Sequence, residues 1–239
     1  MKDSKTYGQK VGKLFRSLKQ KYPQVKKVDF DDPADALVYA IVSERIRAST
    51  ARTITRKMEK HFVDLNDLRV SRTEEVLEML GPSGPDSRAT ASVLTQVLNS
   101  IYNKYNIVSL VGLKEVGKRQ ARKQLEKLDG LSRFAVNYCF LAALRGHCIP
   151  LTQKMIDYLR AGEFVHPAST EDDIEGFLER QITAANAYEF YSLLRQESEK
   201  AKRPGRTAAK KTGKTKVSKK KPKKTAKKTT KKTKRTGKS

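Results

Sequence analysis

The sequence predicts an all-α domain, an orthogonal bundle of about ten short helices, followed by a disordered basic tail. Apolar residues recur at helical spacing from about residue 32 to residue 198, and no stretch shows the alternation typical of a strand. The chain has no glycine-rich nucleotide-binding loop. Its last forty residues contain no aromatic and no acidic residue. We therefore expect a helical domain over residues 1–199 and a tail over residues 200–239.

Signals for helix starts place the elements in chain order. Asp32 is a suitable N-cap and Pro33 fits the first helical position, which predicts a helix over residues 31–47. Further helices are expected over 49–62, 71–80, 86–105, 113–128 and 132–144, from about 152, and twice within 170–198. A loop is expected over 81–85. The N-caps expected for the later helices are Ser49, Ser71 in a capping box with Glu74, Asp86, Ser132 and Thr152.

The positive charge is concentrated in the tail. The chain has 51 Lys and Arg and 26 Asp and Glu; residues 200–239 hold 20 of the basic residues, so the net charge of +25 divides into +20 there and +5 elsewhere. Such a composition, which resembles the Lys-rich tails of linker histones, cannot bury a core but can neutralise many phosphates. We expect duplex DNA as the main partner, with RNA open as a second. A solubilising tail, a localisation signal and an anionic-membrane tether are alternatives.

Membrane, secreted and metal-binding classes are disfavoured. No apolar run approaches the roughly 18 residues of a spanning helix, and the N-terminal segment lacks a signal-peptide core. The expected location is intracellular: a bacterial cytoplasm or nucleoid, or the nucleus of a eukaryote. Cys139 and Cys148 fit no C-x-x-C spacing, and His147 has no further ligand nearby, so no metal site is expected. Cys139 is expected to pack in the core.

Three segments resemble, in order, the helix-hairpin-helix DNA glycosylases of the endonuclease III family. The family's opening helix pair is similar to residues 33–62, PADALVYAIVSERIRASTARTITRKMEKHF. Its hairpin LPGVGRKTA, the following apolar helix and the I-P-V-D-T-H-V segment are similar to residues 125–159, LEKLDGLSRFAVNYCFLAALRGHCIPLTQKMIDYL. Its closing pair is similar to residues 171–199, EDDIEGFLERQITAANAYEFYSLLRQESE. The resemblance implies the fold of these glycosylases.

The resemblance also implies that the turn within residues 125–133 binds a DNA phosphate through backbone N–H groups. Gly130 matches a family glycine, Asp129 replaces the family's Pro, and Ser132 replaces its second Gly while still able to cap a helix. A plain corner between two helices, and for Arg45 a salt bridge to a nearby Glu, are the alternatives. The residues expected to contact DNA are Lys127, Gly130, Leu131, Ser132, Arg133 and, in the turn between the first helices of the resemblance, Arg45.

The positions that carry the family's chemistry are changed. By the resemblance, Phe134 stands at the catalytic Lys and Thr152 at the catalytic Asp; Phe has no amine and Thr no charge, so no catalytic residue is expected. Lys154 and Asp157 are more easily explained as solvated or salt-bridged, and Lys127 as a phosphate contact. The four-cysteine loop of many relatives is missing, so no iron–sulfur cluster is expected.

The sequence therefore predicts a DNA-binding protein with a base-excision-repair glycosylase-like fold and without glycosylase or AP-lyase activity. An active glycosylase or lyase that uses unconventional residues is one alternative. The other is a nucleoid-compacting or scaffolding protein whose tail is its sole DNA contact.

Overall fold

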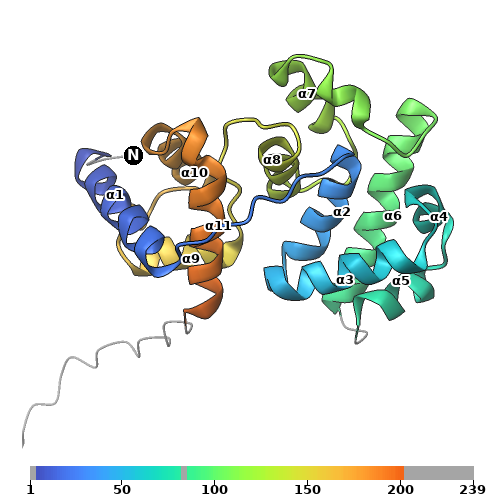
Figure 1. Cartoon of the computed structure of the whole chain (residues 1–239), viewed down its shortest axis with the longest axis horizontal. Coiled ribbons are helices and arrows are strands. Elements are labelled where there is room, and N and C mark those ends of the chain that lie inside the picture. The colour runs from blue at the N-terminus through green and yellow to red at the C-terminus, as the bar shows by residue number, and fades with distance from the viewer. Residues whose placement is uncertain (1–3, 82–84, 202–239) are drawn as a thin grey trace, which may run out of the picture. The chain divides into compact units, whose positions relative to one another are not determined.

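The computed structural model describes residues 4–81 and 85–201 (Figure 1). These residues form eleven α-helices, one 3₁₀ helix and no strand, which confirms the predicted all-α class. Beyond Ala201, the tail expected over residues 200–239 lies outside the described residues. The helices are α1 (Ser4–Lys21), α2 (Pro33–Ser43), α3 (Ala48–His61), α4 (Leu65–Val70), α5 (Thr73–Leu80), α6 (Pro85–Tyr105), the 3₁₀ helix η1 (Val111–Lys114), α7 (Lys118–Leu125), α8 (Arg133–Ala142), α9 (Gln153–Ala161), α10 (Glu171–Gln181) and α11 (Ala184–Lys200).

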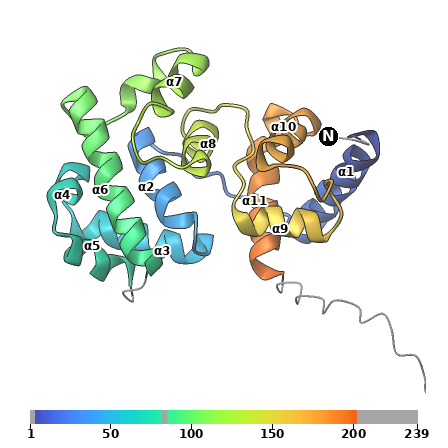
Figure 2. The ribbon, with the colours of Figure 1, turned by 180° about the vertical axis from the view of Figure 1, so that it is seen from behind.

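The helices form two groups that meet at α8. One group contains α2 to α7, in which α2 packs against α3 and α6, and α6 packs against α4 and α5. The other contains α1, α9, α10 and α11, in which α11 contacts α1 and α9. Both views show α8 between the groups (Figures 1 and 2). Because α8 contacts α2 on one side and α11 on the other, its first residues face elements of both groups.

The central helices α2 and α8 are apolar on nearly every side, which is why they are buried. Asp32 caps α2 by accepting a hydrogen bond of 2.8 Å from the Ala34 N–H, and Pro33 follows it, both as predicted. Cys139 is fully buried, as expected for a core residue. Across the described part of the chain, no helix combines the length and apolar character needed to cross a membrane.

Several helix starts differ from the prediction. Helix α3 begins at Ala48 after Arg47 rather than after Ser49, and α6 begins at Pro85, so Asp86 lies in its first turn instead of capping it. The expected capping box at Ser71 was wrong. The unpredicted helix α4 ends there, and the Ser71 hydroxyl donates to the Asp67 carbonyl oxygen at 2.7 Å. Helix α1 was not predicted either.

Candidate nucleic-acid interface

The turn between α7 and α8 is anchored by leucines on its α7 side. Leu125, the last residue of α7, is fully buried, and Leu128 is 4% exposed. Beyond them the chain turns sharply at Gly130, whose φ of +87° lies in the left-handed region that a side chain disfavours. The two leucines hold the end of α7 in the core, while the polar residues of the turn remain at the surface.

Helix α6 supports this turn from one side. The Asp129 N–H donates to the Ser100 hydroxyl oxygen at 3.0 Å. A Cβ on Gly130 would lie 2.9 Å from Cδ and 3.0 Å from Oε1 of Gln96. Gly130 is therefore favoured by its backbone conformation, whereas the exposed Gln96 side chain could move aside for a Cβ. The sequence analysis did not identify Gln96 and Ser100. Their spacing of four places them on one face of α6, and this spacing was the only sequence signal that could have indicated their contact with the turn.

Ser132 caps α8, as predicted. Its hydroxyl oxygen accepts from the Ala135 N–H at 3.1 Å and its hydroxyl donates to the Glu44 carboxylate at 2.8 Å, which links the hairpin to the turn between α2 and α3. Among the described residues, no acceptor contacts the backbone N–H groups of residues 130–134. These groups lie at the positive end of the α8 dipole, an arrangement that favours an anion.

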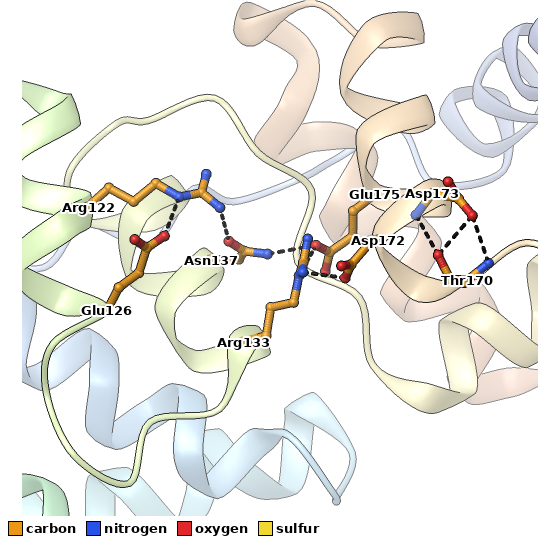
Figure 3. Close-up of polar contacts among 8 residues, drawn as sticks. All are labelled: Arg122, Glu126, Arg133, Asn137, Thr170, Asp172, Asp173 and Glu175. Carbon is orange, nitrogen blue, oxygen red and sulfur yellow. Dashed lines mark hydrogen bonds and ion pairs between the residues drawn. The ribbon is translucent and has the colours of Figure 1, made fainter. Parts of the chain in front are cut away.

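Arg133, the first residue of α8, extends away from the turn. Its Nε donates to Glu175 and its Nη1 to Asp172, both on α10, and Figure 3 shows the side chain reaching toward that helix. Burial raises the pKa of the Glu175 carboxyl above its usual range, although the hydrogen bond from Arg133 acts in the opposite direction. A residue expected to contact DNA is thus paired with two carboxylates in the free protein.

The other predicted contacts differ in their surroundings. Lys127 is exposed and has no hydrogen bond or ion pair within the described chain, and Leu131 is half-buried. Arg45 contacts the carboxylate of Asp86 at 3.2 Å, and both side chains are well exposed. The partner is thus the first-turn Asp of α6 rather than a Glu. An exposed pair of this kind is weak, so Arg45 is accessible to another anion.

The two positions that the resemblance aligns with the catalytic Lys and Asp are both buried. Phe134 is 4% exposed and Thr152 is 5% exposed. The Phe134 ring stacks on Tyr138 with centroids 6.1 Å apart, and the guanidinium carbon of Arg195 lies 5.6 Å from the Phe134 centroid. Thr152 is the N-cap residue of α9, as predicted, but its side chain makes no capping hydrogen bond.

Arg195 of α11 connects the Phe134 and Tyr138 rings to the turn between α2 and α3. It is 4% exposed, pairs with Glu199, and donates to the carbonyl oxygens of Ser43 and, at 2.8 Å, Ile46. These bonds fix the guanidinium beside the Phe134 ring. In contrast, Lys154 and Asp157, the other catalytic candidates, are exposed on α9, where Asp157 accepts from Gln153 at 2.9 Å.

A cavity of about 330 Å³ lies between the α1–α2 linker, α2, α3, the start of α4 and α8. Tyr138 lines it, whereas Phe134 and Thr152, the positions aligned with the catalytic residues, do not. Burial at the cavity wall, reinforced by the neighbouring carboxylates Asp32, Glu59 and Asp31, raises the pKa of Asp35 to about 6.

Asp35→Asn is expected to raise the melting temperature at about pH 8 and to leave it nearly unchanged at about pH 4. Because the folded-state pKa is raised, the stability contributed by protonated Asp35 is complete below the unfolded pKa and is lost as the pH rises through about 6. Asn stays neutral and avoids this loss. Asp35 lines the cavity but is still partly exposed to solvent, so the expected change in melting temperature is small. Equal melting-temperature differences at the two pH values would contradict this assignment.

Comparisons with known proteins identify the fold. No protein-family model matches the sequence, and no curated protein matches it. A trapped covalent complex of endonuclease III with DNA has a TM-score of 0.62 at 16% identity, covering 78% of this chain and 84% of the other. A thermostable thymine-DNA glycosylase has a TM-score of 0.60 at 13% identity, covering 83% and 90%.

A third similar structure is the 3-methyladenine DNA glycosylase of H. pylori, with a TM-score of 0.58 at 15% identity, covering 84% of this chain and 99% of the other. The similarity in all three cases extends over most of both chains. Identities this low show the fold alone. The described chain therefore has the fold of the helix-hairpin-helix DNA glycosylases.

Proposed function

We propose that this protein binds duplex DNA through its sugar–phosphate backbone and that the α7–α8 hairpin is the contact of the folded domain. The observation that carries the proposal is the row of backbone N–H groups at residues 130–134, which have no acceptor within the described chain and lie at the start of α8. The similar endonuclease III structures are complexes with DNA, which supports the same ligand here. The expected side-chain contacts are Lys127, Leu131, Ser132, Arg133 and Arg45.

We also propose that the protein lacks glycosylase and AP-lyase activity. Lyase chemistry needs an amine that reaches the sugar carbon, and proton transfer needs a carboxylate beside it. Phe134 and Thr152 supply neither group, and Arg195 is fixed beside the Phe134 ring. The burial of these side chains favours a filled site over one reorganised around new catalytic residues. The exposed positions of Lys154 and Asp157 support the same conclusion.

Many proteins of the endonuclease III family, which this chain resembles, carry an iron–sulfur cluster. Such a cluster does not fit this chain. Such a cluster is held by four cysteine thiolates, and the sequence has two cysteines. Both are buried: the Cys139 Sγ donates to the Pro33 carbonyl oxygen and the Cys148 Sγ donates to the Asn137 carbonyl oxygen. Burial raises the pKa of both thiols, which disfavours the thiolate that a metal requires.

The basic tail is proposed to add sequence-independent affinity for duplex DNA and for RNA. A polycation releases counterions from any nucleic acid, so its contribution depends on salt and little on sequence. A nucleoid-compacting or scaffolding protein would use the tail alone. The hairpin distinguishes the two functions, because only a DNA-binding domain loses affinity when its turn is altered.

A chain ending at Ala201 is expected to give no borohydride-trapped product with duplex DNA containing an abasic site. Trapping requires a Schiff base between an amine and the sugar carbon, and Phe134 removes the amine at the expected position. The tail is left out because its lysines could attack abasic sites nonspecifically. Endonuclease III serves as the positive control.

Duplexes carrying uracil, an oxidised pyrimidine or an alkylated base extend the test, read as strand cleavage on a gel. No cleavage above background is expected for any of them. A trapped product that forms without the tail and disappears on Lys154→Ala or Lys127→Ala would establish an enzyme with an unconventional nucleophile.

A further inference from the structure

Two carboxylates of α10 hold the guanidinium of Arg133, and they lie in different surroundings. The Glu175 side chain is 5% exposed, whereas the Asp172 side chain is 72% exposed. Arg133 itself is 49% exposed and bridges the two (Figure 3). The pair with Glu175 is therefore poorly screened by solvent, and the pair with Asp172 is well screened.

Glu175 is held from a second direction by a chain of polar side chains. Asn137 Nδ2 donates to Glu175 at 3.2 Å, and Asn137 Oδ1 accepts from Arg122 at 3.1 Å; Arg122 in turn pairs with Glu126 at 3.0 Å (Figure 3). If Arg133 moved away, the neutral Asn137 amide would be the one donor left to the buried Glu175 carboxylate among the residues that the structure describes. Leaving a buried charge without its partner is costly, so the pair stabilises the contact between α8 and α10.

The backbone and the side chain of Arg133 thus differ in their partners: the backbone N–H is free to bind an anion, whereas the guanidinium is paired with carboxylates. Its backbone N–H belongs to the row of amides at residues 130–134, which make no hydrogen bond within the described chain. Its guanidinium turns toward α10 instead (Figure 3). A phosphate bound to the amides would attract the guanidinium, which could reach it only by leaving at least one carboxylate.

We propose that Asp172 and Glu175 compete with DNA phosphate for Arg133 and thereby lower the affinity of the hairpin for DNA. This inference rests on the proposed phosphate site. The free energy gained when Arg133 reaches a phosphate is reduced by the ion pair that it gives up. The exposed partner Asp172 is the easier one to release, because its pair with Arg133 is screened by water.

Asp172→Asn in the full-length chain tests this competition by fluorescence anisotropy with a short labelled duplex. The variant is expected to bind about two- to fivefold more tightly, as expected for loss of one exposed ion pair. Glu171→Gln is the matched control: it removes the same charge from the same turn of α10, and Glu171 does not contact Arg133. Its effect should be clearly smaller.

A double-mutant cycle separates competition from general electrostatics. In a chain carrying Arg133→Gln, Asp172→Asn should increase affinity only as much as Glu171→Gln does. Competition is overturned if Asp172→Asn and Glu171→Gln act equally in the unaltered background, or if Asp172→Asn keeps its full effect without Arg133. Weaker binding by Asp172→Asn would also overturn it, because the carboxylate would then orient Arg133 toward DNA.

Melting temperatures of every variant show whether a change in affinity reflects loss of folded protein. Glu175→Gln provides a second variant, expected to bind DNA more tightly but to melt earlier, since it weakens a buried contact. The proposed phosphate site is tested separately by Gly130→Val. Normal binding by Gly130→Val overturns that site, whereas weak binding by Gly130→Val without an Asp172→Asn effect overturns only the competition.

Discussion

Removal of residues 202–239 is expected to lower the affinity for duplex DNA by about a hundredfold or more at low salt. The segment holds 19 of the 51 Lys and Arg residues and no acidic residue. Each phosphate neutralised releases counterions, so the slope of log affinity against log salt should become shallower by several units. Fluorescence anisotropy over a salt series measures both quantities. The truncation begins after Ala201 because α11 continues through Lys200. The Lys200 Nζ lies 4.4 Å from the centroid of the Tyr22 ring.

A scrambled tail of the same composition is the control for this truncation. It should retain the full affinity, since charge and not residue order determines counterion release. Equal salt slopes for the truncated and full-length chains would show that the tail is not the main DNA contact. Loss of affinity on scrambling would show that the tail recognises its ligand through a specific motif.

Gly130→Val, in a chain ending at Ala201, is expected to weaken binding to duplex or abasic DNA by at least about tenfold. This factor corresponds to the loss of one or two hydrogen bonds between backbone amides and a charged phosphate. Valine disfavours the φ of +87°, so the turn is expected to relax toward another conformation and move its amides. The strain should also lower the free energy of unfolding by about 1–3 kcal/mol. Titration with DNA and urea denaturation measure the two effects on the same samples.

Gly81→Val is a control matched for backbone strain. Gly81 also has a positive φ, of +96°, and a Cβ there meets nothing within 4 Å. This variant should lose stability but keep its affinity for DNA, because Gly81 ends α5 and is not part of the hairpin. If Gly130→Val likewise costs only stability, the turn is a corner between helices and not a phosphate site.

Local sequence signals predicted the parts of the fold that local chemistry determines. Asp32 followed by Pro33 marks a helix start on its own, because the cap and the fixed proline φ act within the first turn. The position of Gly130 and the capping role of Ser132 also followed from neighbouring residues. Each of these predictions was confirmed because its partner lies within a few positions in the sequence.

Features that depend on distant residues could not be predicted in this way. Helix α1 buries Val11, Leu14 and Leu18 and packs Tyr7 and Phe15 beside them, and its stability comes from packing on α10 and α11. The partners of Arg133 lie 39 and 42 positions away in the sequence. The partner of Ser132 in the α2–α3 turn lies 88 positions away. Neither residue type nor spacing specifies such pairs, so the surroundings of the hairpin required the structure.

During synthesis α1 leaves the ribosome before α10 and α11, whose surfaces cover its apolar stripe. Lys21 donates to Glu197 across 176 positions of the chain, and Tyr22 donates to the same carboxylate. The packed group from α2 to α8 can assemble earlier, because its members contact one another. A nascent chain that stops before α10 therefore exposes the apolar residues of α1, which are prone to aggregation or chaperone capture.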